Sequence, residues 1–233
     1  MSVPTKAKAT KRPRTGKPAS AYLAPARLAK IFAGLDQLFP RAQCALRHEN
    51  AFQLLVATIL SAQCTDERVN MVTPGLFQKY PTPQDFASLR QEVLEREIRS
   101  TGFFRNKAKS IIGAARKIVA DFGGKVPQTM EELLTLPGVA RKTANVVLGT
   151  AYGIASGLVV DTHVFRIARR LKLAKQKTPE KVEQDLMKVV PQDRWIAFSH
   201  QMIWFGRKIC QARKPLCAEC PLEPICDSSD KRV

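Results

Sequence analysis

The sequence lacks any run of apolar residues long enough to cross a bilayer, and its first residues lack the apolar centre of a secretory signal. Both absences predict an intracellular protein with no membrane partner. Acidic residues are also scarce, because 20 Asp and Glu stand against 38 Lys and Arg, a formal net charge of +18 at pH 7. Clustered basic residues favour a polyanion such as nucleic acid, although charge alone leaves a ribosome-like or membrane-surface binder open.

Alternation of apolar and polar residues, the pattern of a half-buried strand, is equally scarce. Apolar residues recur instead at helical intervals, most clearly in residues 28–38, 54–60 and 111–122. Pro40 and the glycine pair at 123–124 predict where the first and last of these helices end. The sequence therefore predicts an all-α fold.

Two further helix starts follow from capping residues. Thr129 and Glu132 have capping-box spacing, and Thr178 followed by Pro179 predicts a helix that runs to Val190. The apolar stretch at residues 158–160 is too short to show a strand period, so we expect it to lead into the next helix.

Residues 1–23 combine several Lys and Arg with no acid and few apolar side chains. This composition predicts a disordered basic tail. Such a tail adds nonspecific DNA affinity, serves as a nuclear or organelle address, or is merely solvated, and composition does not choose between these. The chain shows no internal repeat, and the residues around 153–157 are a plausible crossing between two lobes.

Four of the six cysteines lie close together near the end of the chain, as Cys210, Cys217, Cys220 and Cys226. Four thiolates suit an iron-sulfur cluster or tetrahedral zinc, whereas two disulfides are disfavoured without a secretory segment. Zinc sites usually pair two Cys-x2-Cys hooks, and only one is present here, so the spacing favours a [4Fe-4S] cluster and leaves zinc open. The remaining cysteines, Cys44 and Cys64, are expected to be buried, reduced thiols.

The segment from Leu136 to Ala144 joins two helical stretches through a turn built on Pro137 and Gly138. This pattern predicts a helix-hairpin-helix, in which free backbone N–H groups at the start of the second helix form an anion site suited to a DNA phosphate. A purely structural pair of helices would have the same pattern. The expected phosphate contacts are Gly138, Val139, Ala140 and Thr143.

Lys142 lies in the first turn of that second helix, beside Arg141. Most lysines at such a position contact phosphate or solvent. A helix amino terminus, a neighbouring guanidinium and an apolar pocket would each disfavour the protonated amine. A neutral amine is a nucleophile able to attack a sugar carbon and form a Schiff base, so Lys142 is a candidate nucleophile.

Asp161 follows two valines and precedes the helical stretch at residues 164–171. Helix capping alone would explain this residue. A carboxylate facing Lys142 would also accept the proton of the amine and stabilise positive charge on a deoxyribose ring. One carboxylate oxygen can serve each role, and His163 receives no catalytic role.

The order of these motifs resembles the endonuclease III family of DNA glycosylases, over nearly all of the chain after the tail. The resemblance implies a [4Fe-4S] cluster on the four cysteines, with Lys142 as nucleophile and Asp161 as assisting carboxylate. It implies a six-helix barrel domain at residues 44–154 and a helical cluster domain formed by residues 24–43 and 155–233. A cleft between them would bind duplex DNA that carries an oxidised pyrimidine or an abasic site.

The resemblance also places Gln63, after Leu60, as the residue that fills the gap left by an extruded base. The stretch from Gly102 to Lys107 resembles the loop that wedges the opposite strand, with Phe103 where an aliphatic residue is more usual. Ala140 stands where the hairpin pattern more often has a second glycine, and little damage is expected because alanine suits a first helical turn.

The resulting hypothesis is a bifunctional glycosylase and AP lyase that acts as a monomer on DNA, in a nucleoid, nucleus or mitochondrion. The cluster would be structural, with Arg213 and Lys214 between its first two cysteines reaching phosphates. One alternative is a monofunctional mismatch glycosylase, which would lack an amine at position 142; another is a noncatalytic DNA-binding protein. Trp195 and Trp204 are expected to be packing residues.

Overall fold

Residues 19–232 are described by the structure, a computed structural model, and every regular element in that range is helical. The all-α prediction is therefore confirmed. Residues 1–18 of the predicted tail lie outside the described range. Its last residues form the short helix α1 (Ala19–Tyr22), whose Tyr22 carbonyl accepts a hydrogen bond from Arg27, so order begins earlier than predicted.

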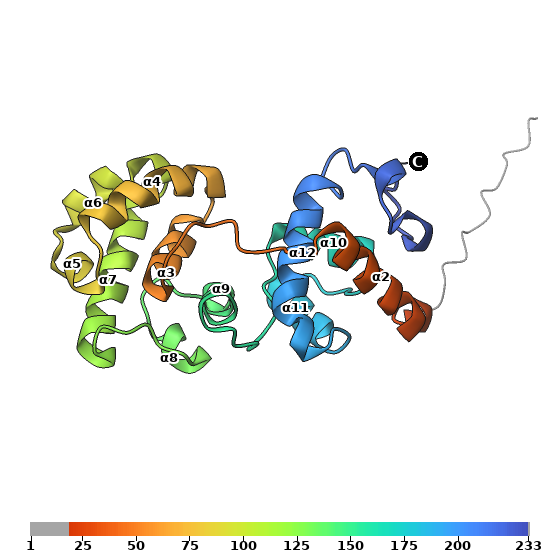
Figure 1. The fold of residues 1–233 in the computed structure, drawn as a ribbon, viewed down its shortest axis with the longest axis horizontal. Helices are drawn as coiled ribbons and strands as arrows, with labels where there is room; N and C mark the ends of the chain where they lie inside the picture. Colours follow the sequence, from red (N-terminus) through yellow and green to blue (C-terminus); the bar gives the residue numbers. More distant parts are fainter. Residues whose placement is uncertain (1–18, 233) are drawn as a thin grey trace, which may run out of the picture.

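The buried apolar side chains gather in two separate clusters, which Figure 1 shows as two lobes side by side. The first lobe contains α3 (Ala51–Leu60), α4 (Asp66–Lys79), α5 (Pro83–Ser88), α6 (Gln91–Glu97), α7 (Phe104–Phe122), α8 (Met130–Leu134) and α9 (Arg141–Tyr152). The second contains α2 (Pro25–Leu38), α10 (Thr162–Arg170), α11 (Pro179–Met187) and α12 (Trp195–Lys208). Four short 3-10 helices complete the order: Arg99–Thr101, Gln192–Arg194, Cys217–Glu219 and Glu223–Ile225.

Helix α3 is the centre of the first lobe. Every residue of it except Ala51 is buried, and it packs against α4, α7 and α9. The side chain of Asn50 caps its start by accepting a hydrogen bond from the Gln53 N–H. A helix that is apolar on all sides must be enclosed by others, which explains the ring of helices around α3.

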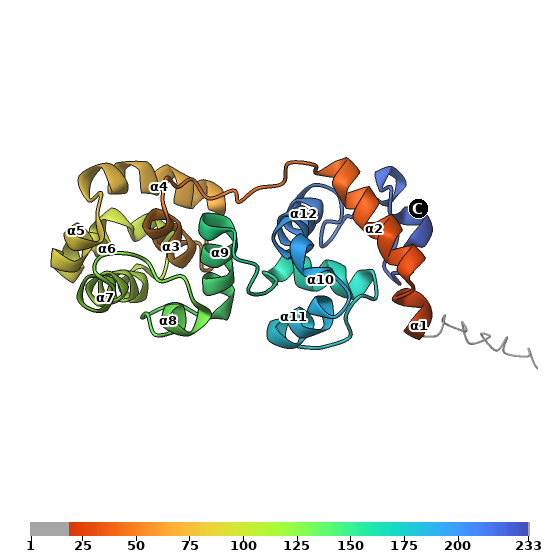
Figure 2. The same ribbon diagram turned by 60° about the horizontal axis from the view of Figure 1, so that its bottom comes forward.

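The second lobe joins the two ends of the described chain, because α2 packs against α12 although more than 150 residues separate them. Two segments therefore cross between the lobes, one from α2 to α3 and one from α9 to α10, as Figure 2 shows. The second crossing includes the predicted segment at 153–157 and the buried residues 158–160, which form neither helix nor strand.

The predicted helix ends are largely confirmed. Helix α2 ends two residues before Pro40, α7 ends at Gly123 with φ +58°, and Thr129 and Thr178 cap α8 and α11. The prediction that α11 runs to Val190 was wrong, because the helix ends at Met187. Pro191 disfavours a helical conformation for the residue before it, and the last turn tightens so that Val189 and Val190 both donate to the Leu186 carbonyl.

None of the helices within residues 19–232 has the length and apolar character that a bilayer crossing requires.

Candidate active site

A large pocket of about 810 Å³ lies between the two lobes. Its walls come from the turn between α3 and α4, from the first turns of α9 and α10, and from the end of α12. Lys142 and Asp161, which are 19 positions apart in sequence, both line it, and so does Gln63. The pocket has the size range of small-ligand sites, which is roughly 300–1,000 Å³.

The hairpin turn sets the direction of Lys142. Gly138 has φ +77°, and a Cβ there would lie 2.5 Å from the Ser110 Cβ, so only glycine fits. Helix α9 then begins at Arg141 after Ala140, which offers no side-chain cap to the first N–H groups. The first turn, with Lys142 and Thr143, therefore keeps the free donors and positive dipole end that an anion would need.

The other residues predicted to contact phosphate differ in how exposed their side chains are. The side chain of Val139 is buried and its N–H donates to the Leu136 carbonyl, so Val139 has no donor left for a phosphate. Ala140 is exposed, as are Arg213 and Lys214 in the loop after Cys210, and neither basic residue lines the large pocket.

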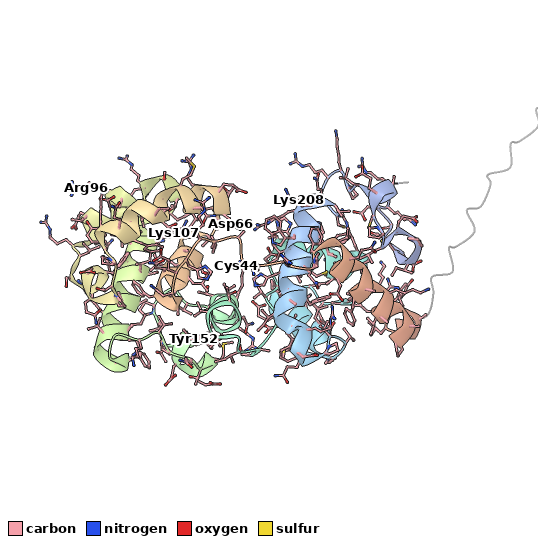
Figure 3. All side chains as sticks on the ribbon, viewed as in Figure 1. Cys44, Asp66, Arg96, Lys107, Tyr152 and Lys208 are labelled. Carbon is pink, nitrogen blue, oxygen red and sulfur yellow. The ribbon has the colours of Figure 1, made fainter. Side chains whose placement is uncertain are left out.

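Lys142 itself is exposed, and most side chains around the pocket are polar or charged. The apolar enclosure considered from the sequence is therefore absent in the protein alone. Four other side chains place charge in the same pocket: Asp66, Glu67, Arg207 and Lys208. Figure 3 shows Asp66 and Lys208 on opposite sides of the gap between the lobes.

Asp161 caps α10 as predicted, and it does so with a single oxygen. Its Oδ1 accepts from the N–H groups of His163 and Val164, both at 2.8 Å. Its Oδ2 makes no hydrogen bond to these groups, so it is free to face the pocket that Asp161 lines together with Lys142. Burial lowers the pKa of the neighbouring His163, so its imidazole is neutral near pH 7.

A network between the lobes holds the start of α9. Arg141 donates two hydrogen bonds to Glu183 of α11, at 2.8 and 3.0 Å, and Asn145 donates a third at 2.9 Å. The pKa of Arg141 is raised above its usual value, chiefly by its own hydrogen bonds to Glu183. The first turn of α9, which carries Lys142, is thereby fixed to the opposite lobe.

Sequence reasoning missed the ion pair between Asp66 and Arg207, whose atoms lie 2.6 Å apart across the pocket. It also did not show that the packing residue Trp204 faces the pocket. Trp195 is buried as predicted, but Trp204 is only partly buried, lines the pocket and has the Arg207 guanidinium 5.6 Å from its ring centre. Since helix α12 contributes apolar residues on several sides, its periodicity did not reveal which tryptophan faces the gap.

Cys44 and Cys64 are half-buried free thiols that pack against the first core, so they are less enclosed than expected. Burial raises the pKa of Cys44, which keeps that thiol protonated at neutral pH. Cys64 lines the large pocket, four residues after Leu60.

The four clustered cysteines surround one small cavity of about 30 Å³ in the second lobe. The rest of its wall is largely apolar, and Arg170 donates a hydrogen bond to the Cys210 Sγ at 3.3 Å. Burial, with the charges of the other three cysteines, raises the pKa of Cys220 to about 11. Among residues 19–232, no three His, Cys, Asp or Glu side chains are arranged around a single metal ion.

Comparison with known proteins gives consistent matches. Residues 56–192 match the HhH-GPD superfamily base excision DNA repair protein family. Endonuclease III of Synechocystis sp. is 58% identical over 87% of this chain and 93% of its own length. Endonuclease III of Bacillus subtilis is 47% identical over 85% of this chain and 90% of its own, and that of Escherichia coli is 39% identical over 87% and 95%.

Two solved structures with 44% sequence identity have similar folds. A non-covalent endonuclease III–DNA complex matches with a TM-score of 0.83, over 87% of this chain and 94% of its own. A trapped endonuclease III–DNA covalent intermediate matches with a TM-score of 0.81, over 86% and 95%. A thermostable thymine-DNA glycosylase, at 22% identity and a TM-score of 0.75, shares the fold.

Proposed function

The chain belongs to the HhH-GPD superfamily and, within it, to the endonuclease III family, and on that premise we propose that Lys142 and Asp161 are its catalytic pair. The protein is a DNA glycosylase and AP lyase of base excision repair. We take its substrate to be duplex DNA with an oxidised pyrimidine or an abasic site. The observation that carries the proposal is the convergence of Lys142 and Asp161, from different helices, on one pocket between two lobes.

The chemistry follows from the two side chains. The amine of Lys142, once neutral, attacks C1′ of the extruded nucleotide while the bond from C1′ to the base breaks and the base leaves with that electron pair. The Oδ2 atom of Asp161 accepts the proton that the amine loses. Opening of the sugar ring, in which O4′ takes up the proton held by Asp161, then gives a protonated imine between Lys142 and C1′. Transfer of a C2′ proton to water leaves the electron pair that expels the 3′ phosphate by β-elimination. Base removal and strand cleavage thus share one residue.

Bound DNA would supply the enclosure around Lys142 that the free protein lacks. Lys142 is exposed here, and an extruded nucleoside in the pocket would cover it and exclude water. Free N–H groups at the start of α9 would hold a phosphate of the same strand, with Gly138, Ala140 and Thr143 in contact. Val139 would not donate to it, because its N–H already bonds the Leu136 carbonyl. Gln63 would fill the gap left by the base, and Phe103, which is 62% exposed, would wedge the opposite strand.

The monofunctional alternative is disfavoured because position 142 carries an amine. The noncatalytic alternative is disfavoured by the relative that has been trapped as a covalent intermediate with DNA.

Borohydride trapping tests the catalytic role of Lys142. Wild-type protein mixed with a duplex that carries an oxidised pyrimidine should form a covalent adduct after reduction, and Lys142→Gln should form none while still binding the duplex. The exposed Lys177→Gln variant removes the same charge elsewhere and should keep the adduct. A wild-type protein that releases base without any trapped adduct would overturn the imine.

We also propose that Cys210, Cys217, Cys220 and Cys226 hold a [4Fe-4S] cluster. The support is their common cavity, its apolar wall and the Arg170 donor, which suits a sulfur that carries negative charge. Zinc sites usually pair two Cys-x2-Cys hooks, whereas only Cys217 and Cys220 form one here, so the spacing also favours a cluster. When bound, the cluster would stabilise this loop; no catalytic step passes through it.

Metal analysis tests the cluster. The purified protein should contain about four irons and four sulfides per chain and absorb visible light. Cys220→Ser should lose the absorbance and lower the thermal midpoint, whereas Cys44→Ser should keep both. Stoichiometric zinc without sulfide would contradict the proposal.

Lastly, we propose that the two apolar clusters are the cores of two domains, residues 44–154 and residues 24–43 with 155–233. Arg213 and Lys214 are proposed as phosphate contacts of the second domain, and a monomer is the proposed working form.

A further inference from the structure

Lys107 is buried, with 5% of its surface exposed, although it lies in the first turn of α7. A lysine at a helix amino terminus opposes the helix dipole, and a buried ammonium loses its hydration. Burial accordingly lowers the pKa of Lys107 below its usual value, although the nearby Cys64 partly opposes this effect. Neither helix formation nor core packing accounts for a lysine here, so its contacts explain its position.

The ammonium of Lys107 donates to two backbone carbonyls from different segments. One is Leu60 O at 2.8 Å and the other is Thr101 O at 2.7 Å. Leu60 is the last residue of α3, so its carbonyl is among those that a helix end leaves without an intrahelical donor. A cation is also favourable there, because that end of the helix dipole is negative. Figure 3 shows Lys107 within the first lobe.

Each of these carbonyls directly precedes a loop with unusual backbone. Three positions after Leu60, Gln63 has φ +52°, and two positions after Thr101, Phe103 has φ +46°. Only one other non-glycine residue in the described range, Lys172, has a positive φ. Both side chains are exposed, and such conformations persist only where the surrounding structure enforces them.

We propose that Lys107 is a positioning residue for two loops: the loop after Leu60, which carries Gln63 (the Gln63 loop), and the loop after Thr101, which carries Phe103 (the Phe103 loop). By bonding to the start of each, Lys107 fixes their positions relative to one another, so that the two loops enter DNA together. This inference rests on the proposed function, because Gln63 is the residue that fills the gap in one strand and Phe103 the one that wedges the other. Through Lys107, a displacement of either loop is transmitted to the other. Base extrusion then depends on a side chain that touches neither DNA nor the reacting atoms.

The test compares two reactions of the same enzyme under single-turnover conditions. Base release from an oxidised pyrimidine requires extrusion of a stacked base, whereas cleavage at an abasic site does not. Lys107→Met should slow base release on the order of 10²-fold, since small misplacements of positioning groups have effects of that size. Cleavage of the abasic duplex should slow less than about tenfold. Lys117→Met, which removes a partly exposed charge paired with Asp121 on the same helix, should leave both rates unchanged.

A mutant cycle separates positioning from general loosening of the fold. In the Gln63→Ala, Phe103→Ala double variant, the two side chains that Lys107 is proposed to position are absent. Adding Lys107→Met to that variant should therefore change the rate of base release less than about threefold. Equal slowing of the two reactions, or a full additional effect in that background, would overturn the inference. If the Lys107→Met protein shows no cooperative thermal unfolding, and so is not folded, the Lys107→Arg variant is tested in its place. A guanidinium retains the positive charge but cannot reproduce the same two contacts to backbone carbonyls. The ratio of base release to abasic cleavage should then fall, and an unchanged ratio rejects the proposal.

Borohydride trapping of the wild-type enzyme on abasic DNA distinguishes the two failures. Absence of that adduct rejects the proposed function, whereas a normal adduct with an additive mutant cycle rejects only the role of Lys107.

Discussion

Asp161 caps a helix with one carboxylate oxygen and also lines the pocket. The shared Oδ1 holds the carboxylate in place through two N–H groups, which are themselves fixed by α10. The cap therefore orients a carboxylate that lines the same pocket as Lys142. The sequence predicted the cap, since aspartate before a helix is a common capping residue, and the structure confirms it. The catalytic role of Asp161 stays a proposal.

Replacing Asp161 by asparagine separates these roles. The asparagine side chain would retain an oxygen for the cap, so thermal stability should change little, while base release should slow about 10²-fold or more without the carboxylate. Asp161→Ala should lose the cap as well and cost about 1 kcal/mol of folding free energy. Single-turnover rates and thermal melts measure the two effects, and a wild-type rate for the asparagine variant would contradict the role of the charge.

At the scale of elements, helix α9 has its start fixed from both sides. The hairpin turn enters it through Gly138, and Glu183 of α11 binds Arg141 and Asn145 from the opposite lobe. The hairpin was predictable because proline and glycine are local signals. Glu183 was not, because it lies 42 positions from Arg141 and looks like any helix-surface carboxylate in the sequence.

Loss of Glu183 should loosen α9. In Glu183→Ala the buried Asn145 amide loses its acceptor, whereas Arg141 is partly exposed and regains water, so we expect about 1–2 kcal/mol of destabilisation. That corresponds to a thermal midpoint lower by about 2–8 °C. Abasic-site cleavage should slow too, since Lys142 is the neighbour of Arg141. The exposed Glu180→Ala change on the same helix is the control, and an equal effect there would argue against the bridge.

At the scale of the whole molecule, a basic protein keeps an acidic residue in the gap where DNA is proposed to bind. Asp66 of the first lobe pairs with Arg207 of the second, and both side chains are partly buried. Because this ion pair links the two lobes, it restrains their position relative to one another. It also keeps the Arg207 guanidinium from binding a DNA phosphate.

Asp66→Asn should free Arg207 for a phosphate. Binding to undamaged duplex should then tighten, and the slope of log affinity against log salt should steepen by about 0.9, the value of one additional phosphate contact. Arg207→Met should leave the slope at or below that of the wild type. Fluorescence anisotropy over a salt series measures both, and identical slopes for the wild type and Asp66→Asn would show that Arg207 stays unavailable to DNA.

The sequence by itself determined what depends on neighbouring residues: helix periods, the caps at Thr129, Asp161 and Thr178, the hairpin at Gly138 and the grouping of four cysteines. Those features act over a few positions, so they can be recognised in one dimension. Only the tertiary structure decided that Lys107 links two loops, that Glu183 holds α9 and that Asp66 meets Arg207 across the lobes. In each case a charged side chain meets partners supplied by another segment, and where that segment lies depends on packing of the whole chain.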